Sequence, residues 1–69
     1  MADLKDTVAT NLRRLRHSKV WRQEDLADRV GLSVRYFGQL ERGQTSMSVT
    51  VLGRLADALA VDATKMAAP

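Results

Sequence analysis

The sequence predicts an all-α fold, a compact bundle of four helices with a short fifth, and three observations support this class. Apolar residues recur at intervals of three and four, the spacing of one helical face, in successive segments of the chain. The alternation of apolar and polar residues that marks a half-buried strand is not found. Glycine or serine stands between segments, where helices commonly end and begin. Residues 1–69 are expected to form one domain without an internal repeat or linker.

The first helix is expected from about Asp3 to Ser18. Its predicted buried face consists of Leu4, Val8, Leu12 and Leu15, spaced four, four and three apart. Asp3 is in position to cap the start of this helix, and the cations near its end suit the negative end of the helix dipole. With Arg22 at the next cap position, Trp21 would pack on Leu26 as a hydrophobic staple.

Residues 23–43 contain two short helical patterns with only a tight corner between them. The apolar positions that would hold this corner together are Leu26, Ala27, Val30, Phe37 and Leu40. Gly31 can end the first helix in the left-handed conformation, and the hydroxyl of Ser33 can cap the second. Two helices joined in this way describe a helix-turn-helix unit, although an ordinary helical hairpin has the same spacing.

A further helix is expected after the polar segment 44–48, with Ser48 as its cap. Its predicted buried face consists of Val49, Leu52, Leu55, Ala56 and Leu59. Gly53 weakens this helix by up to about 1 kcal/mol relative to alanine, and close packing against another helix is one reason for a glycine there. A last turn or two is expected from Asp62 to Met66.

The size and composition of the chain limit the classes of function. A chain of 69 residues buries only roughly 60% of the surface that its unfolded form exposes. Because cysteine is absent, disulfides and thiolate metal sites are excluded, and a homodimer is the expected way to enlarge the core. No apolar run approaches the roughly 18 residues that span a bilayer, and no signal sequence is evident. We expect a soluble, cytoplasmic protein with no membrane partner.

Positive charge is concentrated in the middle of the chain. Residues 13–44 contain eight Lys or Arg and four Asp or Glu, for +4, whereas the whole chain carries +3. Clustered basic residues are typical of nucleic-acid binding, although a solvated helical face has the same composition. An enzyme is not expected, since one histidine and no cysteine offer no nucleophile with a base. No cofactor or metal is expected either, because His17 has no second ligand at metal spacing.

The run RQEDLADRVGLSVRYFGQLERGQTSMSVTVLGRLADALAV, residues 22–61, resembles the DNA-binding domain of phage repressors and Cro-type regulators, also called the xenobiotic-response-element family. The most specific motifs are QEDLA, the turn at Gly31, LERG and LADALAV, and the resemblance covers roughly residues 8–66. It implies a bundle of four or five helices whose third helix lies in the major groove of double-stranded DNA.

The resemblance implies DNA contacts for ten residues. Gln23 would hold a backbone phosphate and brace the recognition helix. The positions expected to meet base edges or adjacent phosphates are Ser33, Val34, Arg35 and Gln39. Arg35 would specify sequence, since a guanidinium can pair with guanine O6 and N7, and Val34 could touch a thymine methyl. Tyr36 could donate to a phosphate or pack on its own helix. The loop expected to grip the sugar-phosphate backbone consists of Arg42, Gln44, Thr45 and Ser46.

Other positions match the family pattern only in part. Arg16 and Glu41 correspond to a pair that forms a partly buried ion pair in some relatives, which would remove Arg16 from the basic surface. The departures are Val20 for a glycine, Arg22 for a capping Ser or Thr, Gly38 for a larger residue and Met47 for a proline. Without a side-chain cap the second helix is expected to lose about 1 kcal/mol.

The leading hypothesis is a sequence-specific transcriptional regulator that binds a palindromic operator as a homodimer. A restriction-modification controller falls within this class. The alternative is an antitoxin or other protein-interaction module on the same bundle, with a toxin as its partner. Exposed Met47, Val51 or Met66 would serve that role. The final helix and the loop before Ser48 are the expected dimer surface.

Overall fold

A computed structural model describes residues 3–69 of the chain, and these residues form five helices. The helices are α1 (Leu4–Ser18), α2 (Gln23–Val30), α3 (Val34–Glu41), α4 (Val49–Ala58) and α5 (Ala63–Ala67). The described range contains no strand and no helix that is long and apolar enough to cross a membrane. The predicted all-α bundle with a short fifth helix is therefore confirmed.

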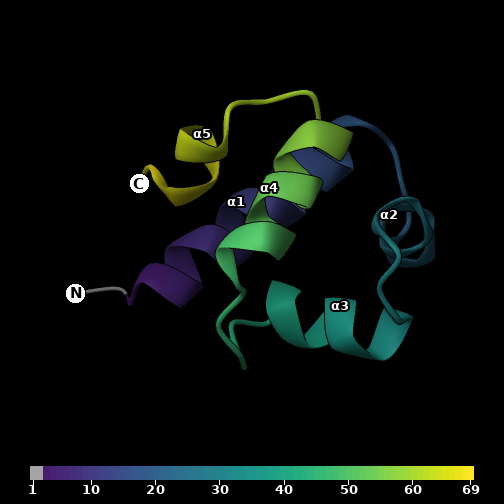
Figure 1. Ribbon diagram of the computed structural model, residues 1–69, viewed down its shortest axis with the longest axis horizontal. Helices are drawn as coiled ribbons and strands as arrows, with labels where there is room; N and C mark the ends of the chain where they lie inside the picture. Colours follow the sequence, from purple (N-terminus) through teal and green to yellow (C-terminus); the bar gives the residue numbers. More distant parts are fainter. Residues whose placement is uncertain (1–2) are drawn as a thin grey trace.

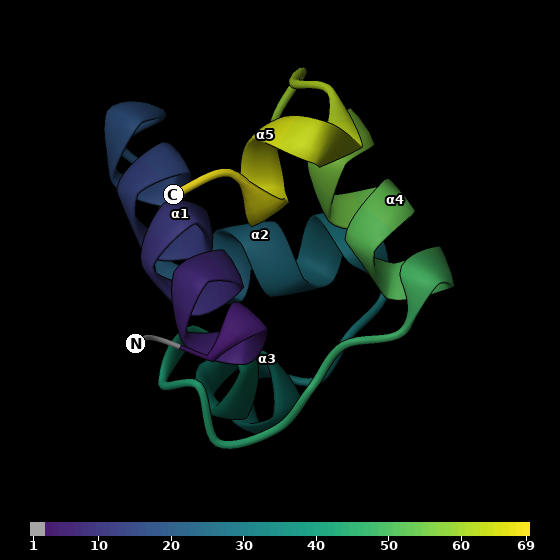
Figure 2. The same cartoon turned by 90° about the vertical axis from the view of Figure 1, so that its left-hand side faces the viewer.

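The helices pack so that α3 and the loop after it close one end of the bundle. Helix α1 contacts α3 and α5, α2 contacts α3 and α4, and α4 contacts α5. Figures 1 and 2 show α3 and the α3–α4 loop along one edge of the molecule, with α5 toward the opposite side. The third helix is thus supported from behind by α1 and α2.

The core draws on every helix of the bundle. Its largest fully buried side chains are Leu12, Leu26, Phe37, Leu40, Leu55, Leu59 and Met66. All five positions predicted to hold the corner are buried, as expected. Removing one of these large side chains would cost about 2–5 kcal/mol, because a cavity adds to the lost transfer free energy.

Three predictions about apolar positions are wrong. Leu4 is 62% exposed and Val49 is 86% exposed, although both continue a helical stripe. Each is the first residue of its helix, where the side chain is left largely open to solvent. Met66, expected to be exposed for a partner, is fully buried and anchors α5 to the core. Leu15 and Leu52 are half-buried and pack against the same core.

Close packing does not explain Gly53. A Cβ placed on this residue would meet no atom within 4 Å. The glycine in the middle of α4 therefore faces open space, and an alanine there would fit without strain.

The starts of the helices are capped largely as predicted. The hydroxyls of Ser33 and Ser48 accept hydrogen bonds from the backbone N–H groups of Tyr36 and Val51, both at 3.1 Å. Asp3 is at the N-cap of α1, but its side chain makes no capping hydrogen bond, so that prediction is wrong. Its Oδ2 lies 4.0 Å from the Nζ of Lys5 instead, because the carboxylate turns toward that cation.

The N-cap residue of α2 is Arg22, whose side chain cannot accept a hydrogen bond from the helix N-terminus. The backbone N–H of Arg22 donates instead to Oδ2 of Asp25, at 2.8 Å. This hydrogen bond and the nearby Arg22 guanidinium hold the pKa of the Asp25 carboxyl below its usual range. The third residue of the helix thus supplies part of the capping that the missing Ser or Thr would give.

Four helices end through a left-handed residue. The residues with positive φ are Val20 (59°), Gly31 (73°), Gly43 (69°) and Ala60 (57°). After each, a backbone N–H bonds to a carbonyl five residues earlier, as Leu32 does to Ala27 at 2.9 Å. Valine at position 20 therefore keeps the conformation that a glycine would take, at a cost of roughly 1–2 kcal/mol.

Candidate nucleic-acid interface

The corner between α2 and α3 presents one face of α3 outward. Gly31 turns the chain at the end of α2. Ser33, two residues later, is the N-cap residue of α3. Phe37 and Leu40 are buried on the inner face of α3, which fixes the rotation of the helix. Positions on the outer face are consequently held in one orientation relative to the bundle.

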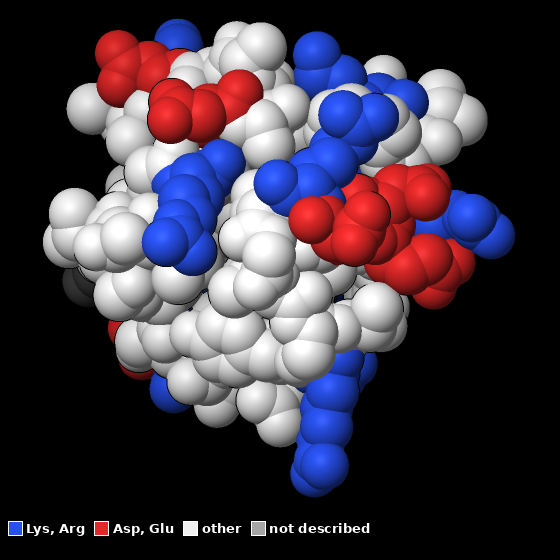
Figure 3. Space-filling view, turned by 45° about the vertical axis from the view of Figure 1, so that its right-hand side comes forward, with Lys and Arg blue, Asp and Glu red and all other residues white. Residues whose placement is uncertain are grey.

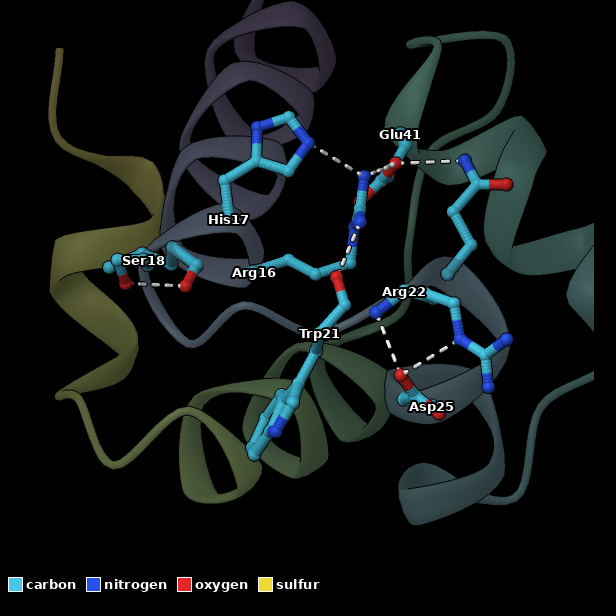
Figure 4. A network of polar contacts seen from close by, with 9 residues as sticks. Arg16, His17, Ser18, Trp21, Arg22, Asp25 and Glu41 are labelled. Atoms are coloured by element: carbon cyan, nitrogen blue, oxygen red, sulfur yellow. Dashed lines mark hydrogen bonds and ion pairs between the residues drawn. The ribbon is translucent and has the colours of Figure 1, made fainter.

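A buried polar network fixes the C-terminal end of α3 (Figure 4). Glu41 is 2% exposed and binds Arg16 through both carboxylate oxygens, with 3.1 Å between Oε1 and Nη2. Nη1 of Arg16 also donates to the carbonyl oxygen of Trp21, at 2.8 Å. This network joins α1, the α1–α2 connection and α3, and it confirms the ion pair that the family resemblance implied.

Gln23 belongs to the same network. Its Nε2 donates to Oε1 of Glu41, at 2.9 Å, which links the first residue of α2 to the last residue of α3. The second hydrogen on Nε2 can still be donated outward, because an amide nitrogen carries two. The geometry therefore agrees with the bracing expected of Gln23 and leaves one donor for a phosphate.

Each of the other nine predicted contact residues keeps at least partial exposure. Those exposed are Ser33, Val34, Arg35, Arg42, Gln44 and Ser46, and those half-buried are Tyr36, Gln39 and Thr45. Together they follow α3 and the loop after it, along the edge seen in Figures 1 and 2. Tyr36 packs partly against the core, so both roles considered for its side chain are compatible with its position.

On the face shown in Figure 3, the basic residues do not form one continuous patch. Arg16 is 8% exposed and neutralised by Glu41, and Arg22 pairs with Glu24 at 3.3 Å. Figure 3 shows acidic groups next to basic groups in some places, and uncharged surface separates these mixed clusters. The exposed arginines Arg35 and Arg42 are therefore a better guide to the DNA-binding surface than the net charge of residues 13–44.

The acidic side of α2 flanks this edge. A hollow of about 500 Å³ is lined by Trp21, Glu24, Asp25, Asp28, Arg29, Leu32 and Val34. The guanidinium of Arg29 lies 4.2 Å from the centre of the Trp21 ring, a cation–π contact. Trp21 is half-buried and packs against the core, which supports its predicted structural role.

Sequence reasoning missed the buried Asn11. Its Nδ2 donates to the carbonyl oxygens of Met66, at 2.9 Å, and Ala68, at 2.6 Å. These bonds satisfy one carbonyl in the last turn of α5 and the carbonyl of its C-cap residue, and they tie that short helix to α1. The signal was the position of Asn11 three residues after Val8, on a stripe that is otherwise apolar.

Comparison with known proteins places these features in a family. The family described as "Helix-turn-helix domain" matches residues 8–68. The HTH-type transcriptional regulator y4dJ of Sinorhizobium fredii is 37% identical over 67 residues, which cover 97% of this chain and 87% of that protein.

Solved structures agree with this match. The hypothetical transcription factor NHTF from Neisseria superposes with a TM-score of 0.93 at 34% identity, over 97% of this chain and 77% of that one. The restriction-modification controller protein C.AhdI from Aeromonas hydrophila gives 0.86 at 35% identity, over 90% and 94%. The chain thus belongs to the helix-turn-helix domain family.

Proposed function

We propose that this chain is a sequence-specific DNA-binding transcriptional regulator of the Cro and xenobiotic-response-element type, with α3 in the major groove. The observation that carries the proposal is the fixed presentation of α3. Val34 and Arg35 are exposed on its outer face, while the inner face is buried and Glu41 is held by Arg16 and Gln23. A helix held in one orientation by such contacts can place side chains against base edges.

The side chains on α3 suit different parts of the DNA. The Arg35 guanidinium has the geometry to pair with guanine O6 and N7, and Val34 can contact a thymine methyl. The hydroxyl of Ser33 accepts a hydrogen bond from the backbone of Tyr36, but its own hydrogen remains available for a phosphate. Gln39 is placed one helical turn after Arg35, where it can reach a base edge or the adjacent phosphate.

The loop after α3 would bind the sugar-phosphate backbone. Arg42, Gln44 and Ser46 are exposed and Thr45 is half-buried, so guanidinium, amide and hydroxyl donors lie along one stretch of chain. Such groups bind phosphate oxygens without reading sequence. Together with Gln23, they would set the angle at which α3 enters the groove.

We further propose that two copies bind a palindromic operator. The chain extends over 31 × 23 × 22 Å, and its core is small. Two bodies of this size side by side can present their α3 helices to successive major grooves, which are about 34 Å apart. Because Met66 is buried in its own chain, a dimer surface on α5 would have to use the remaining exposed residues of that helix.

In-vitro selection of bound DNA from a random pool tests this proposal. We expect a motif with two inverted half-sites about one helical turn apart, and binding that weakens steeply with salt. Arg35→Ala should relax the preference at one position of each half-site, by about 1–3 kcal/mol. Arg54→Ala, at an exposed arginine on α4, is the matched control and should leave the motif unchanged.

Two results would contradict the proposal. Failure to enrich any sequence would argue against sequence-specific binding. Recovery of the same motif by Arg35→Ala and by the unaltered protein would argue against α3 as the reading helix.

A further inference from the structure

The guanidinium of Arg42 lies against Gly38, one helical turn earlier. A Cβ placed on Gly38 would be 3.0 Å from Nη1, 3.5 Å from Nη2 and 3.6 Å from Cζ of Arg42. These are the three nearest heavy atoms that such a methyl group would meet. The guanidinium therefore fills the space that a side chain at position 38 would occupy.

The backbone and the side chain of Arg42 are set by the same turn. Arg42 is the C-cap of α3, and its backbone N–H donates to the carbonyl oxygen of Gly38, at 3.1 Å. Side chains of a helix lean toward its N-terminus, so residue 42 lies above residue 38. With glycine below it, the planar guanidinium can lie close to the helix surface.

The charge of Arg42 is not neutralised by its surroundings. Across residues 3–69, no carboxylate oxygen lies within 4.0 Å of its side-chain nitrogens. Its neighbour Glu41 is already bound to Arg16 and Gln23, so that carboxylate is not free to capture it. Because Arg42 is also exposed, a seated and unpaired cation is presented at the end of α3.

We propose that Gly38 is a positioning residue, which seats the Arg42 guanidinium for contact with a DNA phosphate. This inference rests on the proposed function, since it assigns one phosphate contact at the same interface. A cation held near its bound position loses less conformational entropy when the phosphate arrives. It also explains a glycine inside an eight-residue helix, where alanine would be the better helix former.

Gly38→Ala would displace the guanidinium without disturbing the core. A contact of 3.0 Å is tighter than a carbon and a nitrogen normally make, so the flexible end of Arg42 must shift by a few tenths of an ångström out of its seat. The displaced side chain must then be ordered on binding, and we expect DNA affinity to fall about two- to tenfold. Gly53→Ala is the matched control, because that glycine is also inside a helix and meets no atom.

The experiment measures binding of a mixed-sequence DNA duplex by fluorescence anisotropy over a range of salt concentrations. The proteins compared are the unaltered chain, Gly38→Ala, Arg42→Ala, the double variant and Gly53→Ala. Arg42→Ala should lower the slope of log affinity against log salt by about 0.9, the value for one phosphate. Gly38→Ala should weaken binding and lower the slope in part, and it should add nothing in the Arg42→Ala background. Gly53→Ala should bind as the unaltered chain does.

The outcomes separate the inference from the proposed function. Gly53→Ala should melt at a higher temperature than the unaltered chain, because its methyl group meets no atom. A melting temperature of Gly38→Ala at least equal to that of the unaltered chain would exclude unfolding as the cause of weaker binding. If Gly38→Ala kept full affinity and slope, or its loss added in full to that of Arg42→Ala, Gly38 would not seat the arginine. If Arg42→Ala bound like the unaltered chain, the assigned phosphate contact would be wrong. If the unaltered chain bound no duplex, the proposed function itself would fail.

Discussion

The strained valine between α1 and α2 offers a quantitative test of the loop geometry. Val20 has a φ of 59°, where a β-branched residue costs roughly 1–2 kcal/mol relative to glycine. Its side chain is 89% exposed, so removing it sacrifices almost no buried surface. Glycine also makes the unfolded chain more flexible, which offsets about 0.4–1 kcal/mol of the strain that the substitution relieves. Taking the middle of each range, Val20→Gly should therefore stabilise the fold by about 0.8 kcal/mol.

Circular dichroism during thermal and urea unfolding measures this change. A gain of that size corresponds to a rise in melting temperature of about 2–8 °C for a domain of this length. Val49→Gly is the matched control, since that valine is 86% exposed but begins a helix with ordinary backbone geometry. Glycine there should give no stabilisation. A Val20→Gly variant that was no more stable than the unaltered chain would refute the assignment of strain to this turn.

Two further predictions concern polar contacts. Glu41→Gln leaves the buried guanidinium of Arg16 without its counter-ion, so the free energy of unfolding should fall by about 3–5 kcal/mol. Urea titration checks this against Glu24→Gln, which breaks an exposed pair and should cost about 0.5 kcal/mol or less, and similar losses in the two variants would contradict a structural role for Glu41. The pKa of the Asp25 carboxyl is lowered in the folded chain, chiefly by the hydrogen bond from the backbone N–H of Arg22. The carboxylate therefore stabilises the fold above about pH 4, and this stabilisation is lost as the pH falls further. Asp25→Asn should weaken this acid dependence of stability, and an unchanged pH profile would show that the carboxylate does not support α2.

Local signals made much of the fold predictable. The glycine at position 31 and the serines at positions 33 and 48 determine where helices end and begin, and the structure places each as expected. Each of these signals acts over one helical turn, within reach of sequence reasoning. The ion pair between Arg16 and Glu41 was different, because spacing alone did not predict it and the family resemblance did.

Features that depend on packing between distant segments could not be predicted. The periodicity that includes Leu4 and Val49 does not show that the first residue of each helix stays exposed. Asn11 binds carbonyls more than 50 residues away, and no local pattern reports such a pairing. The seat at Gly38 depends on the rotamer of Arg42, which the sequence leaves open.

The central claim is that α3 and the loop after it form the DNA-binding edge. Titration of the ¹⁵N-labelled protein with a selected duplex, followed by the backbone amide resonances, tests it most directly. We predict that the largest shifts fall on residues 33–46, while the amides of α5, Ala63–Ala67, move little. Shifts concentrated on α4 and α5, with α3 unchanged, would contradict the claim.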